Sequence, residues 1–163
     1  VCHVRKKPTT LSLNAKGEGY TIHEALQLEN PTGKPIELAP RSFNQIEFGQ
    51  VLINDRSIKQ ISLLNSGDVN YNFSWNTGTR NDISVEPASG TVHKGEKVTV
   101  ELCYSPSLLE HLDNYRVFCN VENGNRYSLS LSGQGHRPKL DFSVFSYDFG
   151  PRFVLGRGLV TNK

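Results

Sequence analysis

The stretch YRVFCNVENGNRYSLSLS, residues 115–132, decides the fold class. Apolar and polar side chains alternate on both sides of its centre, and a period of two is typical of strands with one buried and one solvated face. At the centre stands Asn123-Gly124-Asn125, whose residue types tolerate the positive φ angles of a tight turn. The stretch therefore predicts an antiparallel β-hairpin.

The same alternation recurs on the N-terminal side of this hairpin. It predicts strands at 56–65, 71–76, 82–87 and 97–104. The third of these should lie at a sheet edge, because Pro87 ends it and proline has no N–H to donate to a ladder. With turn-forming residues between them, about seven short strands predict an all-β, seven-stranded immunoglobulin-like sandwich.

Helical periodicity is almost absent from the sequence. The exception follows Pro106, where Ser107 and Glu110 have the spacing of a capping box. This spacing predicts one short helical turn between two strands.

Two phrases of the sequence occur twice. LSLNAKGEG at 11–19 matches YSLSLSGQG at 127–135, and Glu47-Phe48-Gly49 matches Asp148-Phe149-Gly150. Each pair is separated by about 100 residues, which is the length of one β-sandwich domain. The repeats predict a tandem array of similar units, and the lack of Met at position 1 predicts an excerpt from a longer protein.

The repeats also set the expected boundaries. Residues 1–19 should be the closing strand of a preceding repeat, 20–45 a linker rich in proline, 46–135 a complete sandwich, and 136–163 a linker with the opening strand of a following repeat. The glycines of 133–135 should let the chain bend as it leaves the sandwich, because glycine bends without a Cβ penalty. The glycine of Phe-Gly at 48–49 should permit a bulge through which the first strand changes sheets.

Several short motifs occur in an order and spacing that resemble the ASH domain, a branch of the MSP/PapD-like immunoglobulin folds. They are Phe48-Gly49, Leu64-Asn65-Ser66-Gly67, Phe73-Ser74-Trp75, Val85-Glu86-Pro87, Gly90, the run from Val100 to Pro106, Tyr115, and Leu131-Ser132-Gly133-Gln134-Gly135. The resemblance covers the central unit fully and both flanking segments in part.

This resemblance implies a non-catalytic structural scaffold repeat. It implies a fragment of a very large multi-repeat protein of the motile-cilium axoneme, in the central pair apparatus needed for ciliary motility. The implied partners are other axonemal central-apparatus proteins and neighbouring repeats of the same chain, with only an indirect link to microtubules. The implied location is the cytoplasm and cytoskeleton, within the axoneme of the motile cilium.

Composition sets limits on other classes of function. The 163 residues carry a net charge of +2, which gives no clustered basic excess for a nucleic-acid partner. No apolar run approaches the length of a membrane span, so we expect no membrane partner. The odd cysteine count, Cys2, Cys103 and Cys119, fits a reducing compartment, although a bridge between Cys103 and Cys119 stays open if they lie on adjacent strands.

The sequence shows no constellation for catalysis. Its histidines are isolated and no metal-ligand spacing occurs, so no catalytic, cofactor-binding or metal-binding residue is assigned and no cofactor or small-molecule substrate is expected. Glu110-His111 with Asp113 indicates a solvated loop, and a nucleophile pair of Cys119 with His111 lacks any sign of an activated thiolate.

Two single residues have structural interpretations. Trp75 alternates with Tyr71 and Phe73, so we expect its ring in the core. Asn65, two residues before Gly67, should occupy a turn with its amide bonded to local backbone.

Other classes of function remain as alternatives. A cytosolic MSP-type module that recognises acidic peptides would need one basic face, for which Lys94, Lys97 and Arg116 are candidates, interleaved with Glu96 and Glu101. An extracellular adhesion repeat would use the glycosylation sequon that begins at residue 72. The third alternative is an enzyme.

Overall fold

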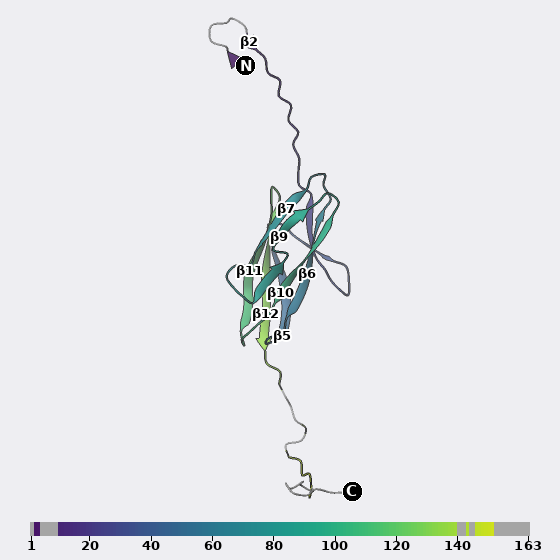
Figure 1. Cartoon of the computed structure of the whole chain (residues 1–163), viewed down its shortest axis with the longest axis vertical. Helices are drawn as coiled ribbons and strands as arrows, with labels where there is room; N and C mark the ends of the chain where they lie inside the picture. Colours follow the sequence, from purple (N-terminus) through teal and green to yellow (C-terminus); the bar gives the residue numbers. More distant parts are fainter. Residues whose placement is uncertain (1, 4–9, 140–142, 144–145, 152–163) are drawn as a thin grey trace, which may run out of the picture.

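The computed structural model describes residues 2–3, 10–139, 143 and 146–151. Ten strands form a sandwich of two five-stranded sheets (Figure 1). The first sheet has the order β4 (Ile36–Leu38), β3 (Glu24–Leu28), β6 (Ser57–Asn65), β10 (Lys97–Tyr104) and β8 (Ile83–Glu86). The second has the order β5 (Phe43–Leu52), β12 (Arg126–His136), β11 (His111–Val121), β7 (Tyr71–Asn76) and β9 (Ser89–Val92). A separate two-stranded pair, β1 (Cys2–His3) with β2 (Thr10–Leu11), precedes them.

The predicted all-β immunoglobulin-like sandwich is confirmed, with three strands more than the seven expected. The described ranges contain no helix. Strand β8 lies at an edge of the first sheet, as the proline after it predicts. The chain enters the sandwich at one end and leaves it at the other (Figure 1).

The core lies between the sheets, where the inward-facing residues of each strand meet. Its largest fully buried side chains include Leu26, Ile46, Ile61, Leu63, Leu102, Tyr104, Tyr127, Leu129 and Leu131. The expected core position of Trp75 is wrong. Trp75 lies one residue before the end of β7, is only half-buried, and packs against the margin of the core. Its indole N–H is buried without a hydrogen-bond partner. The buried aromatic residues of the core include Tyr71, Tyr104 and Tyr127.

The hairpin predicted at 115–132 is present as β11 and β12. Asn123 has a φ of 58°, and the N–H of Gly124 donates to the carbonyl of Val121 at 3.1 Å. In the ladder Val117 lies opposite Leu129, and both side chains are fully buried. Local alternation and turn chemistry were sufficient to predict this element.

The prediction of a linker at 20–45 is wrong, because this interval contributes two strands to the sandwich. Strand β3 pairs antiparallel with β6, and β4 pairs with β3. Leu26 and Leu38, which lie opposite each other, are 0% and 4% exposed. These strands form because the edge of β6 and the apolar interior beneath it must be covered.

Strand β3 also ties the two sheets together. One carboxylate oxygen of Glu24 accepts hydrogen bonds from the backbone N–H and the side-chain amide of Asn125, both at 2.8 Å. Asn125 belongs to the β11–β12 turn of the other sheet. The segment predicted as a linker thus closes the N-terminal end of the sandwich.

The glycines act in part as predicted. Gly49 has a φ of +70°, and the parallel β5–β12 register shifts between Ser132 and Gln134, which is the expected bulge. Strand β5 nevertheless stays in one sheet. The prediction of a bend at 133–135 is wrong, since β12 continues to His136. A Cβ at Gly135 would lie 2.4 Å from the carbonyl oxygen of Leu108, so this glycine permits close packing rather than a bend.

Candidate interaction surfaces

An open groove lies over the first sheet beside the β3–β4 hairpin. Its volume is about 810 Å³, and apolar side chains from three strands line it, among them Leu28, Ile36 and Ile58. Ile36 is 54% exposed. The groove is open and has a mixed apolar and polar lining, which suits a protein surface or peptide rather than an enclosed small molecule.

A polar cluster borders this groove. Lys97 forms an ion pair with Glu29 at 2.7 Å, and the Ser62 hydroxyl donates to the same carboxylate at 2.5 Å. These two donors, Lys97 first, hold the pKa of Glu29 below its ordinary value. Ser62 is fully buried beneath these groups. Lys97 and Glu29 therefore neutralise each other at this border.

A second surface lies at the end of the sandwich where β12 finishes, which we call the exit end. It is formed by the β5–β6 turn (52–56), the β7–β8 loop (77–82) and the β10–β11 loop (105–110). The helical turn predicted at 107–110 is wrong, because carbonyl groups of the β10–β11 loop accept hydrogen bonds from other segments of the chain. The N–H of Asn54 donates to the Pro106 carbonyl at 2.9 Å, and that of Gly135 donates to the Glu110 carbonyl at 3.0 Å.

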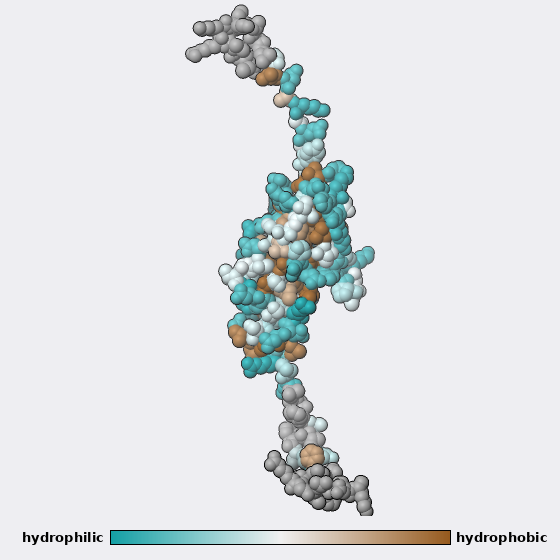
Figure 2. Space-filling view, in the orientation of Figure 1, coloured by the Kyte–Doolittle hydropathy of each residue, from teal (hydrophilic) through white to brown (hydrophobic). Residues whose placement is uncertain are grey.

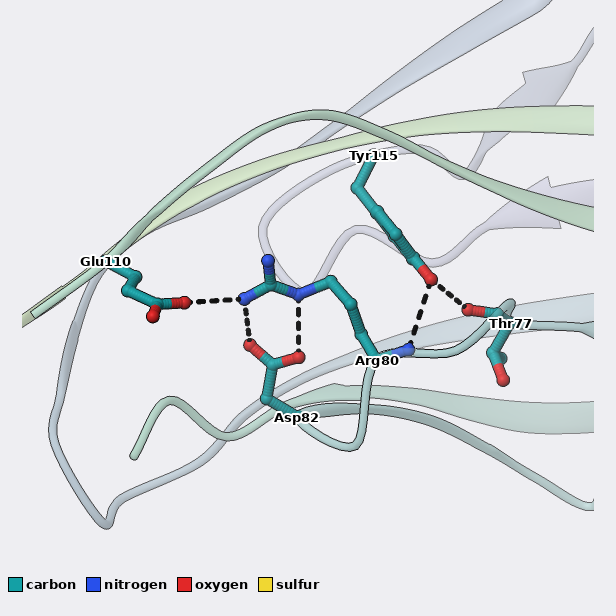
Figure 3. A network of polar contacts seen from close by, with 5 residues as sticks. All are labelled: Thr77, Arg80, Asp82, Glu110 and Tyr115. Carbon is teal, nitrogen blue, oxygen red and sulfur yellow. Dashed lines mark hydrogen bonds and ion pairs between the residues drawn. The ribbon is translucent and has the colours of Figure 1, made fainter. Parts of the chain in front are cut away.

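A charged network holds these loops to one another (Figure 3). The Arg80 guanidinium donates two hydrogen bonds to the Asp82 carboxylate, at 2.8 and 2.6 Å, and its Nη2 also lies 3.3 Å from Glu110. The Tyr115 hydroxyl donates to the Thr77 carbonyl at 2.7 Å. Arg80 therefore connects the β7–β8 loop to the β10–β11 loop.

Residues 42–137, more than half of the chain, match the family described as the fourth Ig-like domain of CFAP74. The chain belongs to this CFAP74 Ig-like domain family. The matched range agrees with the second sheet and most of the first, from the start of β5 to the end of β12.

The chain is also similar, along almost its whole length, to two much longer proteins. It is 27% identical to the human hydrocephalus-inducing protein homolog over 163 residues and 25% identical to the mouse hydrocephalus-inducing protein over 175 residues. The matches cover 98% and 100% of this chain but 3% of each relative. The chain therefore spans a small fraction of the proteins that it matches.

Solved structures similar to the chain include an ASH/PapD-like domain of human CEP192, at 13% identity and a TM-score of 0.49, covering 83% of this chain and 99% of that one. SSP-19, an MSP-domain-like protein of Caenorhabditis elegans, has 10% identity and a TM-score of 0.42, covering 53% and 92%. The family match and the similarity to hydrocephalus-inducing protein (Hydin) confirm the resemblance to the ASH domain.

The structure separates the residues considered for nucleophilic chemistry. In the CFAP74-type domain Cys119 is fully buried in β11, whereas His111 is exposed at the other end of that strand. Burial raises the pKa of the Cys119 thiol to about 12. The bridge left open between Cys103 and Cys119 is absent, because they lie in different sheets and both thiols are free.

This burial gives a prediction for thiol chemistry at pH 8. With a pKa of about 12, only about one in ten thousand Cys119 thiols is ionised at that pH, and the thiolate is the reactive form. Iodoacetamide should therefore modify half-buried Cys103 far faster than Cys119 in the folded domain, measured by peptide mass spectrometry. Denaturant should make the two rates similar. Equal rates in the folded domain would contradict the burial of Cys119.

The three basic candidates do not form one face. Lys97 lies on β10 and is paired with Glu29, while Arg116 lies on β11 of the other sheet, with its guanidinium 4.7 Å from the centre of the Phe43 ring. Lys94 pairs with Asp68. The single basic surface that an acidic-peptide module needs is not assembled from these residues.

Asn65 occupies the turn that the sequence predicts. Its carboxamide oxygen accepts from the N–H of Gly67 at 3.0 Å, and its amide donates to the carbonyl of Val69 at 2.9 Å. The same amide also donates to the carbonyl of Val92, 3.2 Å away in β9. That last contact joins β6 to a strand of the other sheet, and no local signal in the sequence indicates it.

The Arg80 network gives a prediction with a pH dependence. The Arg80 guanidinium holds the pKa of Asp82 below its ordinary value. The stabilisation is therefore present above the unfolded pKa of aspartate, about 3.9, and is lost as pH falls through the lower folded pKa. Arg80→Ala should lower the free energy of unfolding at pH 7 by about 1–2 kcal/mol, and this difference should shrink below pH 4.

Urea unfolding of both proteins between pH 7 and pH 2 checks this expectation. Lys94→Ala is the matched control, because Lys94 pairs with an exposed aspartate and its removal should leave the unfolding midpoint unchanged. A difference between wild type and Arg80→Ala that stays constant down to pH 2 would show that the ion pair is not its cause.

The residues that the structure describes hold no group of three or more histidine, cysteine or acidic side chains arranged for a metal ion. Within the same part of the chain, no helix has the length and hydropathy of a membrane span.

Proposed function

We propose that this chain is a non-catalytic Ig-like scaffold repeat of a motile-cilium axoneme protein, working in the central pair apparatus that ciliary motility needs. The observation that carries the proposal is the match of residues 42–137 to an Ig-like domain of CFAP74, together with similarity along almost the whole chain to hydrocephalus-inducing protein. The ASH-domain resemblance implies the same location in the axoneme.

The surfaces of the domain support a scaffold role. The groove over the first sheet is open and is lined by both apolar and polar side chains. Arg80 and Lys97 are paired within the chain with Asp82 and Glu29. Such surfaces suit contacts with other proteins. The proposed partners are other central-apparatus proteins and neighbouring repeats of the same chain, with microtubules reached through them.

Imaging of the endogenous protein tests the location. An antibody raised against residues 46–135 should label a thin axial line between the doublet microtubules of multiciliated cells in super-resolution images. Cells in which the gene is disrupted are the control and should lose the line. Label at centrosomes, at membrane contact sites or on the cell surface would overturn the ciliary proposal while leaving the fold unchanged.

A further inference from the structure

The exit end exposes apolar side chains that the sandwich does not use. Leu108 and Leu109 are 59% and 57% exposed on the β10–β11 loop, and Leu52 is 38% exposed at the end of β5. Figure 2 shows hydrophobic surface at this end of the sandwich, around the point where the C-terminal segment leaves. Exposed apolar side chains gathered at one end of a domain mark a contact site.

The loop that carries these leucines is fixed before any partner arrives. The Glu110 carbonyl accepts from Gly135 of β12, the Pro106 carbonyl accepts from Asn54, and the Glu110 carboxylate pairs with Arg80. A surface held in this way loses little conformational entropy when it is covered. The leucines are thus presented by a pre-organised loop.

A second copy of the β5 sequence pattern follows the sandwich in sequence. Residues 143–151 repeat the pattern of 42–50, with Tyr147 and Phe149 in the places of Ile46 and Phe48. Ile46 and Phe48 are 1% and 7% exposed in the core, whereas Tyr147 and Phe149 are 70% and 68% exposed. The second copy therefore carries the inward-facing pattern of β5 without a sandwich to cover it.

The connection between the end of β12 and this second copy is short. Strand β12 ends at His136 on the exit end, and residues 137–142 separate it from Ser143. Seven Cα–Cα steps reach at most about 25 Å, which is shorter than the eleven-residue β12 itself, about 36 Å long at the rise of an extended strand. A strand that begins at residue 143 therefore starts within about 25 Å of the end of β12, which lies at the same end of the sandwich as the exposed leucines.

We propose that Leu52, Leu108 and Leu109 form the docking surface for a following Ig-like unit of the same chain, whose counterpart of β5 starts near Ser143 and whose core includes Tyr147 and Phe149. The inference rests on the proposal that the chain is one repeat of an array. It adds to that proposal the surface through which successive repeats contact each other. The short connection keeps the following unit next to this surface, so the docked unit occupies it ahead of any separate protein.

The test uses the chain lengthened at its C-terminus by the natural residues that complete the following unit. Nitrogen-15 relaxation should give both units one shared rotational correlation time. A soluble paramagnetic agent should broaden the Leu108 and Leu109 methyl signals much less than it does in the 163-residue chain. The double variant Leu108→Asp with Leu109→Asp should abolish the shared correlation time while both units stay folded.

Ile36→Asp is the matched control, because Ile36 is equally exposed but lies on the groove away from the exit end, and it should leave the shared correlation time unchanged. Independent tumbling of two folded units in the unsubstituted chain would overturn the docking inference alone. Failure of the added residues to form a folded unit would overturn the array as well. Concentration-dependent pairing of the 163-residue chain through the same leucines would overturn the choice of occupant.

Discussion

Replacing Asn65 with aspartate should lower the free energy of unfolding by about 3–5 kcal/mol. Asn65 is 3% exposed, and its amide is the donor for the carbonyls of Val69 and Val92. A carboxylate in its place has no N–H to donate and turns a negative charge toward two carbonyl oxygens. Both carbonyls lose their donor in a buried site, where unpaired polar groups are most costly.

Chemical denaturation at pH 7 measures this loss, with Asn70→Asp as the control. Asn70 is exposed, and its side-chain oxygen accepts from the N–H of Lys94, a role that a carboxylate keeps. The control should therefore unfold at nearly the wild-type denaturant concentration. Equal midpoints for the two variants would mean that the buried amide does not join the sheets as the structure shows.

The second large effect is expected for Gly135→Val, which should destabilise the domain by about 3 kcal/mol. A Cβ at this position would lie 2.4 Å from the Leu108 carbonyl oxygen and 2.9 Å from the Pro106 Cβ. Valine favours extended strands, so strand propensity cannot be the cause of a loss in β12. The strain must fall on the β10–β11 loop, which has to move away.

The change should therefore be visible at one place in the molecule. Thermal unfolding measures the lower stability, and amide chemical shifts should move most at 105–110 in the variant that remains folded. Gly19→Val is the control, because a Cβ there meets no atom within 4 Å, and it should change neither quantity. Wild-type stability in Gly135→Val would exclude the close approach of β12 to this loop.

Local patterns were enough to predict much of the second sheet and half of the first. The hairpin around Asn123, strands β6, β7, β8 and β10, and the bulge at Gly49 all follow from alternation, turn residues or a residue type that tolerates positive φ. These features depend on backbone geometry within a few residues, so a single segment carries the whole signal.

Strands β3 and β4 lacked such a signal. Leu26 and Leu38 stand among proline, glycine and polar residues, and nothing near them in sequence shows that they are buried. Their burial comes from the pairing of β3 with β6 and of β4 with β3. The helical turn expected at 107–110 was wrong for a related reason. The loop has one local hydrogen bond, from the Glu110 N–H to the Leu108 carbonyl, but other backbone groups of the β10–β11 loop bond to Asn54 and Gly135, which are far from it in sequence.

The candidate surfaces divide in the same way. The sequence alone determined that the chain forms a β-sandwich and that Asn65 shapes a turn, and it contains no set of residues with a spacing typical of catalysis. Only the tertiary structure brought Glu24 to Asn125, 101 positions away, dispersed Lys94, Lys97 and Arg116, and gathered Leu52, Leu108 and Leu109 at one end. Strand period is a property of neighbouring residues, whereas the order of strands in a sheet and the meeting of loops depend on contacts between segments that the chain itself keeps far apart.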